Sequence, residues 1–331
     1  MKVLFIGGTG LISSACTRLA VDRGIDIYHL NRGQSTRLTP VTVKNLRADI
    51  RDKDSVIRML RDMTFDVVVD WVAFTPEHVE VDLELFRDRT KQYIFISSAS
   101  IYQTPPTNLP ITESTPLRNP YWAYSRAKIA CEERLMQAYR QDEFPITIVR
   151  PSHTYDCTFI PMRGRYTVVD RIRKGKNVIV HGDGTSLWTL THSSDFAKGF
   201  VGLLGNSHAI GEAFHITSDE VLTWNHIFEI LAQAAGTKAK IVHIPSDLIA
   251  AYNQEWGASL LGDKAHSRIF DNTKIKRIVP DFTATTHFIR GAEEIIAWYS
   301  ADPSRQIVDK KMDRLMDKII AVYESAYPQV Q

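Results

Sequence analysis

Short, uninterrupted apolar runs alternate with amphipathic stretches through the first half of the chain. The apolar runs predict buried strands at residues 3–6, 26–30, 44–47, 66–70, 93–97 and 146–150. Apolar positions at helical spacing predict helices at residues 11–23, 55–63, 79–89 and 119–140. Strands that alternate with helices in this way form crossover units and a parallel sheet. Because continuous apolar runs are typical of strands covered on both faces, we expect an α/β fold with a doubly wound parallel sheet.

The pattern loosens after Arg150. Two predicted strands, which we expect to return to the first sheet, a small third strand and a helix lie at residues 178–181, 213–217, 241–244 and 223–235. Apolar residues at helical spacing predict a further helix at residues 307–323. This helix either packs on the protein or serves as a dimer or lid element.

Composition and charge narrow the function classes. The chain has 331 residues, 44% of them hydrophobic and 24% charged, which is typical of a soluble globular enzyme and too apolar for disorder. A formal net charge of +2 argues against a dedicated nucleic-acid-binding protein, which carries a strongly basic patch. Three scattered cysteines (Cys16, Cys131 and Cys157) favour neither a disulfide framework nor a zinc site, and we expect no metal. No targeting segment or membrane-spanning run is visible, so we expect a cytoplasmic protein with neither nucleic acid nor a membrane as its partner.

A glycine-rich segment joins the first predicted strand to the first predicted helix. Residues 7–13 read Gly-Gly-Thr-Gly-Leu-Ile-Ser. Glycines permit a tight turn and the close approach of a pyrophosphate, and the helix N-terminus offers free N–H groups to negative charge. A lone glycine triplet is a weak signal, but its place between a strand and a helix makes it a dinucleotide-binding motif of the Rossmann type. We expect the cofactor to contact Gly7, Thr9, Gly10, Leu11 and Ile12.

The end of the second predicted strand bears on the choice of cofactor. An acidic residue about 20 positions after the glycine loop would bind the ribose diol of NAD. Here the strand ends with Asn31 and Arg32. Asn31 removes a charge that would repel a 2′-phosphate, and Arg32 can pair with that phosphate. The cofactor is therefore NAD(P), with NADP favoured over NAD, unless Arg32 is only a solvated turn residue.

Three side chains suit proton transfer coupled to hydride transfer. Tyr124 and Lys128 lie four residues apart on a predicted helix and so share one face. A phenol has a pKa of about 10, and we expect the Lys128 ammonium to lower the pKa of Tyr124. Ser98 follows the strand at residues 93–97, at the sheet edge where open parallel sheets bind ligands. We expect Ser98 to hold the substrate oxygen beside Tyr124.

Taken together, these motifs resemble those of the extended short-chain dehydrogenase/reductases, in particular the NAD-dependent epimerase/dehydratase family. The motifs that carry the resemblance are Gly7-Gly8-Thr9-Gly10, Ala48-Asp49-Ile50, Ser97-Ser98-Ala99-Ser100-Ile101-Tyr102, Tyr124 with Lys128, Arg150-Pro151 and Gly182-Asp183-Gly184. The resemblance runs from Met1 to about Gly291. The Asn-Arg-Gly ending of the second strand is similar to a branch that includes plant RNA-associated homologues.

The resemblance implies further site residues. It makes Ser98, Tyr124 and Lys128 the catalytic set, with Tyr124 and Lys128 also touching the cofactor. It adds to the cofactor contacts Asp49, Ile50, Trp71, Val72, Ala73, Pro151 and His153. It also implies a homodimer formed through the helix that bears Tyr124 and Lys128. Residues 1–155 then form the dinucleotide-binding core, residues 156–300 a smaller substrate-binding region and residues 301–331 a helical tail.

Departures from the family pattern bear on the substrate. Members that use sugar nucleotides clamp the diphosphate with two arginines, and Trp188 and Leu260 stand at the matching positions here. Neither side chain replaces a bidentate guanidinium. Arg163, in a nearby loop, could clamp a different anion or be merely solvated. Substrate candidates are thus Ser100, His153, Arg163 and Trp188.

The dehydratase activity of the family is disfavoured because Ala99 and Ser100 stand where an Asp-Glu pair follows the catalytic hydroxyl. We therefore expect an NAD(P)-dependent oxidoreductase or epimerase that acts at a hydroxyl-bearing carbon of a sugar-like or small carbonyl compound, not a nucleotide-diphosphate sugar. Two alternatives remain. One is a nucleotide-sugar epimerase with an unusual substrate clamp. The other is a non-catalytic, dinucleotide-binding sensor or RNA-associated protein.

Overall fold

Seven parallel strands form the central sheet of the computed structural model, which describes residues 1–326. The strand order is β11-β6-β5-β4-β1-β2-β3. The strands are β1 (Lys2–Ile6), β2 (Asp26–Asn31), β3 (Lys44–Arg47), β4 (Phe65–Asp70), β5 (Thr90–Ile96), β6 (Ile146–Pro151) and β11 (Ala213–Ile216). The order reverses beside β1, which places the carboxyl ends of β1 and β4 at the switch point where doubly wound sheets bind ligands.

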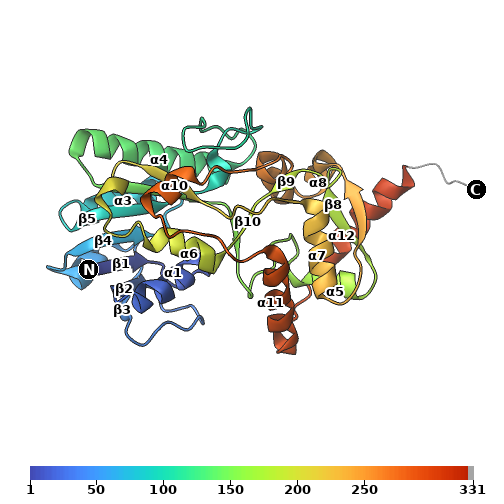
Figure 1. Ribbon diagram of the computed structural model, residues 1–331, viewed down its shortest axis with the longest axis horizontal. Helices are drawn as coiled ribbons and strands as arrows, with labels where there is room; N and C mark the ends of the chain where they lie inside the picture. The colour runs from blue at the N-terminus through green and yellow to red at the C-terminus, as the bar shows by residue number, and fades with distance from the viewer. Residues whose placement is uncertain (327–331) are drawn as a thin grey trace, which may run out of the picture.

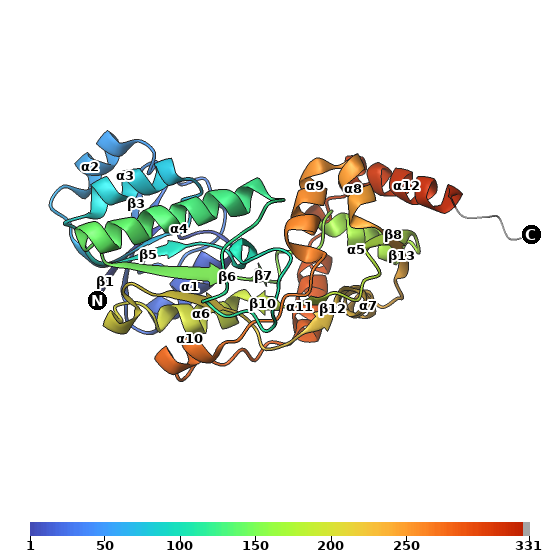
Figure 2. The ribbon, with the colours of Figure 1, turned by 90° about the horizontal axis from the view of Figure 1, so that it is seen from above.

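Helices cover both faces of this sheet (Figure 2). One face carries α2 (Lys53–Leu60), α3 (Pro76–Phe86) and α4 (Ala123–Asp142), and the other carries α1 (Leu11–Asp22), α6 (Ser193–Val201) and α10 (Thr273–Ile278). Side chains alternate along a strand, so Val3 and Phe5 of β1 pack with the α1 and α6 side, while Leu4 and Ile6 pack with the α3 and α4 side. This two-sided burial explains the continuous apolar runs, and the predicted doubly wound sheet is confirmed.

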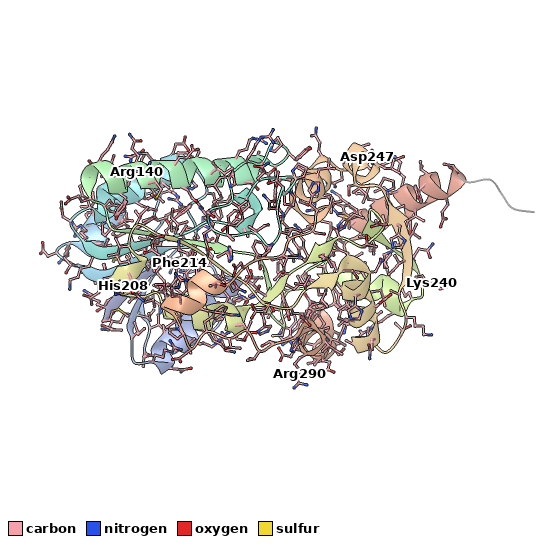
Figure 3. The ribbon with its side chains drawn as sticks, turned by 45° about the horizontal axis from the view of Figure 1, so that its top comes forward. Arg140, His208, Phe214, Lys240, Asp247 and Arg290 are labelled. Carbon is pink, nitrogen blue, oxygen red and sulfur yellow. The ribbon has the colours of Figure 1, made fainter. Side chains whose placement is uncertain are left out.

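A smaller region lies beside the sheet region along the long axis of the molecule (Figure 1). It contains a two-stranded parallel sheet, β8 (Asn177–His181) with β13 (Lys240–Ile244), and its own hydrophobic core. Its helices are α5 (Tyr166–Arg173), α7 (Trp224–Ala234), α8 (Ser246–Tyr252), α9 (Gln254–Ser259), α11 (Phe288–Ser300) and α12 (Lys310–Ser325). Figure 3 labels Lys240 and Asp247 in this region and Arg140 on α4 of the sheet region.

Two short strand pairs join the regions. β7 (His153–Tyr155) pairs with β10 (Leu190–His192), and β9 (Leu187–Trp188) pairs with β12 (Leu222–Thr223). A π-helical turn at Leu260–Lys264 follows α9. These connecting segments matter for function because they carry His153, Trp188 and Lys264 to the carboxyl edge of the central sheet.

One predicted strand returns to the central sheet and the other does not. Strand β11 pairs with β6 as expected. The prediction for residues 178–181 was wrong in its partner, because β8 pairs with β13 in the smaller region. An apolar run marks a buried strand but carries no information on which strand lies beside it.

The last helix packs on the smaller region. Met312, Met316, Ile319 and Ile320 of α12 are buried in its core. Arg171 of α5 is 1% exposed and binds Asp313 and Asp317 of the same helix. The packing matches the interpretation of residues 307–323 as a packed helix. Among the helices of residues 1–326, none has both the length and the apolar character that a membrane crossing needs.

Candidate active site

Side-chain packing and hydrogen bonds hold the glycine loop in place. Gly7 has a φ of +84°, and a Cβ there would lie 2.5 Å from Val72 Cγ1. The ring of His29 packs directly beneath Gly8. Ser13 Oγ accepts from the Gly10 N–H at 2.7 Å and donates to the Gly7 carbonyl at 3.0 Å. There is therefore no space for a side chain at Gly7 or Gly8, and the N-terminus of α1, which follows the loop, suits a pyrophosphate.

A groove of about 480 Å³ opens beside this loop. Eight of the predicted cofactor residues line it: Gly7, Thr9, Gly10, Asn31, Arg32, Asp49, Ile50 and Val72. Nine further lining residues were not predicted as cofactor contacts: Ile6, Leu30, Gly33, Gln34, Ser35, Ala48, Arg51, Phe74 and His78. Several of them adjoin predicted contacts in the chain, as Arg51 adjoins Ile50 and Phe74 adjoins Ala73, so neighbourhood in the sequence offered a signal.

The other eight predicted cofactor residues do not line this groove as the described residues form it, and three of them (Tyr124, Pro151 and His153) line an inner cavity instead. Leu11 and Ile12 begin α1 beyond the loop. The Trp71 ring packs against Phe5 and Phe200 with centroid distances of 5.5 and 4.8 Å, so its side chain belongs to the core. Ala73 is fully buried. Side chains alternate at a strand end, so Trp71 points to the face opposite Val72.

Arg32 lies at the rim of the groove. Its side chain is 62% exposed, and its guanidinium lies 3.9 Å from Asp49. Asn31 Oδ1 accepts from the Gly33 N–H at 2.9 Å, which forms the turn after β2. Both interpretations of Arg32, a phosphate ligand and a solvated turn residue, are compatible with this position.

The loop that follows Arg32 reaches across to the smaller region. Gly33, Gln34 and Ser35 line the groove. Arg37 then donates to Asp156 Oδ2 at 2.7 Å and to Thr158 Oγ1 at 2.5 Å. Both partners come after β7, so this loop ties the cofactor groove to the segment that leaves the sheet.

The three predicted catalytic residues lie at the carboxyl edge of the sheet, where Ser98 and Tyr124 line the same cavity. Ser98 Oγ also lies 2.9 Å from Ser100 Oγ, which in turn lies 2.7 Å from Ser125 Oγ. This hydroxyl chain fixes Ser98 beside Tyr124 and gives Ser100 a supporting place in the site.

Lys128 is positioned by the backbone. Its Nζ donates to the carbonyls of Ala73 at 2.6 Å and Ile96 at 2.7 Å, and burial lowers the pKa of Lys128 to about 8. Burial raises the pKa of Tyr124, and Ser98 opposes this increase. The pKa of Tyr124 is thus raised, whereas we expected Lys128 to lower it; burial of the phenol is the largest effect, and Lys128 does not contribute to the shift.

An inner cavity of about 250 Å³ contains the reactive groups. The predicted residues that line it are Ser98, Ser100, Tyr124, Pro151, His153 and Trp188. Four further residues on the substrate side, Trp122, Asp263, Lys264 and Arg268, also line this cavity and were not among the predicted site residues. Lys264 and Arg268 lie more than 130 residues from Tyr124 in the chain, and no spacing signals that they converge on it.

Trp188 and His153 contact each other in this cavity. The Trp188 indole Nε1 donates to His153 Nδ1 at 3.1 Å, and the two rings meet edge to face. Burial lowers the pKa of His153 well below its ordinary value, with Lys264 and Arg165 acting in the same direction. The imidazole is therefore neutral near pH 7.

A larger outer cavity of about 680 Å³ adjoins the inner one. Trp122, His153 and Lys264 line both and so form the junction. Arg163 lines the outer cavity only, and both of its terminal nitrogens bind Glu255 at 3.1–3.2 Å. Arg163 thus does not join the catalytic set, because the loop before α5 holds it on the far side of the junction.

Arg165 is held in an unusual conformation beside Arg163. Its φ is +52°, a value that favours glycine, and its guanidinium lies 3.3 Å from the centroid of the Phe159 ring. Burial lowers the pKa of Arg165 to about 10. A strained backbone that places a cation in a cavity is a feature of functional sites.

Among residues 1–326, no group of three or more His, Cys, Asp or Glu side chains could hold a metal ion. The candidate site combines hydroxyl, phenol, imidazole, carboxylate and cationic groups beside a dinucleotide groove.

Comparisons with known proteins agree with this geometry. The model of the NAD dependent epimerase/dehydratase family matches residues 3–217. Chloroplast stem-loop binding protein of 41 kDa b from Arabidopsis thaliana is 29% identical over 258 residues, which cover 73% of this chain and 65% of that protein. UDP-glucose 4-epimerase from Lactobacillus helveticus is 33% identical over 170 residues, which cover 45% of this chain and 51% of that protein. The chain thus spans between about half and two thirds of the length of these curated relatives.

Solved structures share the fold at low sequence identity. Epimerase Mth375 from Methanothermobacter thermautotrophicus has a TM-score of 0.75 at 18% identity, covering 92% of this chain and 94% of that chain. UDP-glucose 4-epimerase from Bifidobacterium longum, solved in complex with NAD+ and UDP, has a TM-score of 0.70 at 20% identity, covering 92% and 100%. The glycine loop, the Ser98–Tyr124–Lys128 set and the family match agree, and this chain belongs to the NAD dependent epimerase/dehydratase family.

Proposed function

We propose that this protein is an NAD(P)-dependent oxidoreductase or epimerase that transfers hydride at a hydroxyl-bearing carbon. The observation that carries the proposal is the convergence of Ser98, Tyr124 and Lys128 at the sheet edge beside a groove shaped for a dinucleotide. The groove fits the cofactor because the glycine loop leaves no room for a Cβ at Gly7 and presents the N-terminus of α1.

Tyr124, Ser98 and Lys128 have different roles in the proposed reaction. A bound nicotinamide supplies hydride acceptor and donor chemistry. Tyr124 takes the proton from the substrate hydroxyl, and Ser98 hydrogen-bonds the same oxygen so that it stays aligned. The Ala73 and Ile96 carbonyls hold the Lys128 ammonium. In the complex it would bind the cofactor ribose and favour the ionised form of the Tyr124 phenol. Reduction follows the reverse proton path.

The proposed substrate is a sugar-like or small carbonyl compound rather than a nucleotide-diphosphate sugar. Trp188 occupies the position of a diphosphate-binding arginine, is 3% exposed and uses its N–H on His153. Leu260, at the second such position, is 2% exposed. Neither side chain has a charge with which to hold a diphosphate.

A nucleotide sugar with an unusual clamp is a second candidate, and the outer cavity is the observation that favours it. The volume of about 680 Å³ exceeds what a small sugar needs, and Arg163, Arg165 and Arg305 line it. Relatives named as UDP-glucose 4-epimerase and dTDP-glucose 4,6-dehydratase belong to this class. Tight binding of UDP-glucose that depends on Arg165 would favour this candidate over the first.

Three further assignments belong to the proposal. NADP is preferred over NAD because Asn31 leaves no carboxylate at the end of β2 and Arg32 stands at the groove rim. The protein is cytoplasmic and forms a homodimer through α4. A non-catalytic role, as the name of the Arabidopsis relative suggests for that protein, is the alternative to catalysis. The intact catalytic set and the net charge of +2 favour catalysis instead.

Tyr124→Phe tests the proposed reaction. The variant keeps the ring but loses the proton acceptor, so turnover should fall by a factor of about 10² to 10⁴ while dinucleotide affinity is unchanged. Turnover is followed through the near-ultraviolet absorbance of reduced nicotinamide with a panel of sugars and polyols, and affinity by calorimetry. Full activity in Tyr124→Phe would refute the assignment.

A further inference from the structure

The inner cavity contains two cations that share one carboxylate. Arg268 lies 3.5 Å from Asp263 and donates to Thr104 Oγ1 at 2.5 Å. The Lys264 ammonium lies 3.6 Å from the same carboxylate. With one carboxylate against two cations, the lining carries a net charge of +1 when His153 is neutral.

Two indole rings hold this ammonium in place. Lys264 Nζ lies 5.4 Å from the Trp122 ring centroid and 5.6 Å from that of Trp188. Cation–π attraction fixes the position of the charge without using any of its three N–H donors. Burial lowers the pKa of Lys264, with Asp263 opposing, so an anion beside the ammonium would stabilise its charged form.

A second donor lies at the same junction. An indole N–H only donates, so the Trp188 bond requires an unprotonated Nδ1 on His153. Because the imidazole is neutral, its single proton is then on Nε2. His153 and Lys264 both line the inner and the outer cavity. Trp188 thus positions both groups, one through its N–H and the other through its ring face.

We propose that Lys264 and His153 form a carboxylate-binding site and that the substrate is a small polyhydroxy acid. Its carboxylate binds at the junction, while a hydroxyl-bearing carbon faces Tyr124. A monoanion matches the single uncompensated charge, whereas a phosphate monoester carries about −1.5 to −2. The inference rests on the proposed function, since it names the substrate class of that same site.

Paired ligands provide the direct test. D-Gluconate and D-glucitol share a carbon skeleton and differ in a carboxylate against a hydroxymethyl group. Binding to the full-length protein with dinucleotide bound is measured through tryptophan fluorescence, since Trp122 and Trp188 line the site. We expect gluconate to bind at least tenfold more tightly than glucitol. Equal affinities, or tighter binding of glucose 6-phosphate than of gluconate, would overturn the carboxylate site.

Substitutions at Lys264 test whether this residue causes the preference for gluconate. Lys264→Met should abolish the preference for gluconate over glucitol, and Lys264→Arg should restore part of it. Lys240→Met, at an exposed position of β13, is the matched control and should keep the full preference. Circular dichroism and thermal melting establish that each variant is folded. A preference that survives in folded Lys264→Met contradicts the proposal.

Trp188→Phe tests the positioning of His153. The phenyl ring keeps an aromatic face for Lys264 but has no N–H for Nδ1. Nitrogen-15 shifts of His153 should report the Nε2–H tautomer in the parent protein and a mixture of tautomers in the variant, with several-fold weaker gluconate binding. An unchanged tautomer or unchanged affinity would remove Trp188 from the site.

These binding measurements involve no turnover. If gluconate has no advantage but a neutral polyol reduces the nicotinamide, the carboxylate site fails and the proposed function stands. If Tyr124→Phe turns over normally, the proposed function fails whatever binds at Lys264.

Discussion

The dinucleotide groove and the substrate cavities are built in different ways. The groove is built around backbone: a positive φ at Gly7 and a helix N-terminus that begins at Leu11, with His29 packed against Gly8. The inner cavity uses side chains from four distant segments, with Ser98 and Tyr124 from the sheet region and Trp188 and Lys264 from the connecting segments. A local motif therefore predicts the cofactor half, while the substrate half depends on tertiary packing.

Removing the Ser98 hydroxyl should have the largest effect and separate the two halves most clearly. Ser98→Ala should lower turnover by a factor of about 10² or more, because the substrate oxygen loses its hydrogen bond beside Tyr124. Dinucleotide affinity should stay within twofold, since Ser98 lines the inner cavity and not the groove. Steady-state kinetics and calorimetry measure the two quantities. Equal losses of turnover and of dinucleotide affinity would mean that the groove and the inner cavity do not act independently.

Glycine substitutions probe the groove by itself. Gly7→Ala should lower the unfolding free energy by about 2 kcal/mol or more, because strain at positive φ adds to a collision with Val72. Gly24→Ala is the matched control, with a φ of +74° but nothing within 4 Å of the added Cβ. Urea unfolding of both variants isolates the collision. Equal losses of unfolding free energy in the two variants would show that Val72 moves aside and that the loop is packed less tightly than we describe.

Each half also contains a buried imidazole, which predicts a common pH dependence. Burial lowers the pKa of His29 beneath the glycine loop and of His181 in the smaller region, each to about 4. The unfolded chain binds these protons below a pKa of about 6.5, so stability should fall as the pH drops from about 6.5 to about 4. Urea unfolding between pH 7 and pH 4 measures the slope, and both His29→Asn and His181→Asn should reduce it. A slope that neither variant changes would assign the effect to other groups.

The smallest expected effect concerns Arg163. Its ion pair with Glu255, whose side chain is 78% exposed, should contribute less than about 1 kcal/mol to stability. Arg163→Gln should leave turnover of a small substrate unchanged, because Arg163 lines only the outer cavity. A large loss of nucleotide-sugar binding in this variant would instead favour the second candidate function. Thermal melting and calorimetry with UDP-glucose measure both.

The same division explains what could be predicted from the sequence. The doubly wound sheet, the glycine loop and the placing of Ser98 beside Tyr124 follow from periodicity and from motifs at strand ends. The partner of β8 was mispredicted because apolar runs carry no pairing information. The absence of arginine at Trp188 was visible, but the hydrogen bond of Trp188 with His153 was not, because it depends on how β9 lies against β7.

The tie between Arg37 and Asp156 has a kinetic consequence. The loop after β2 lines the dinucleotide groove, and an ion pair between Arg37 and Asp156 joins it to the segment after β7. The Arg37 side chain is 29% exposed and that of Asp156 is 10% exposed. Because this ion pair restrains a loop that lines the groove, we expect it to slow the release of a bound dinucleotide. Long residence suits an enzyme that returns hydride to the molecule it came from, whereas net dehydrogenation needs a fresh cofactor in every cycle. Slow dissociation of the dinucleotide from the parent protein would therefore favour an epimerase, and faster dissociation from Arg37→Ala would assign the slow release to this ion pair.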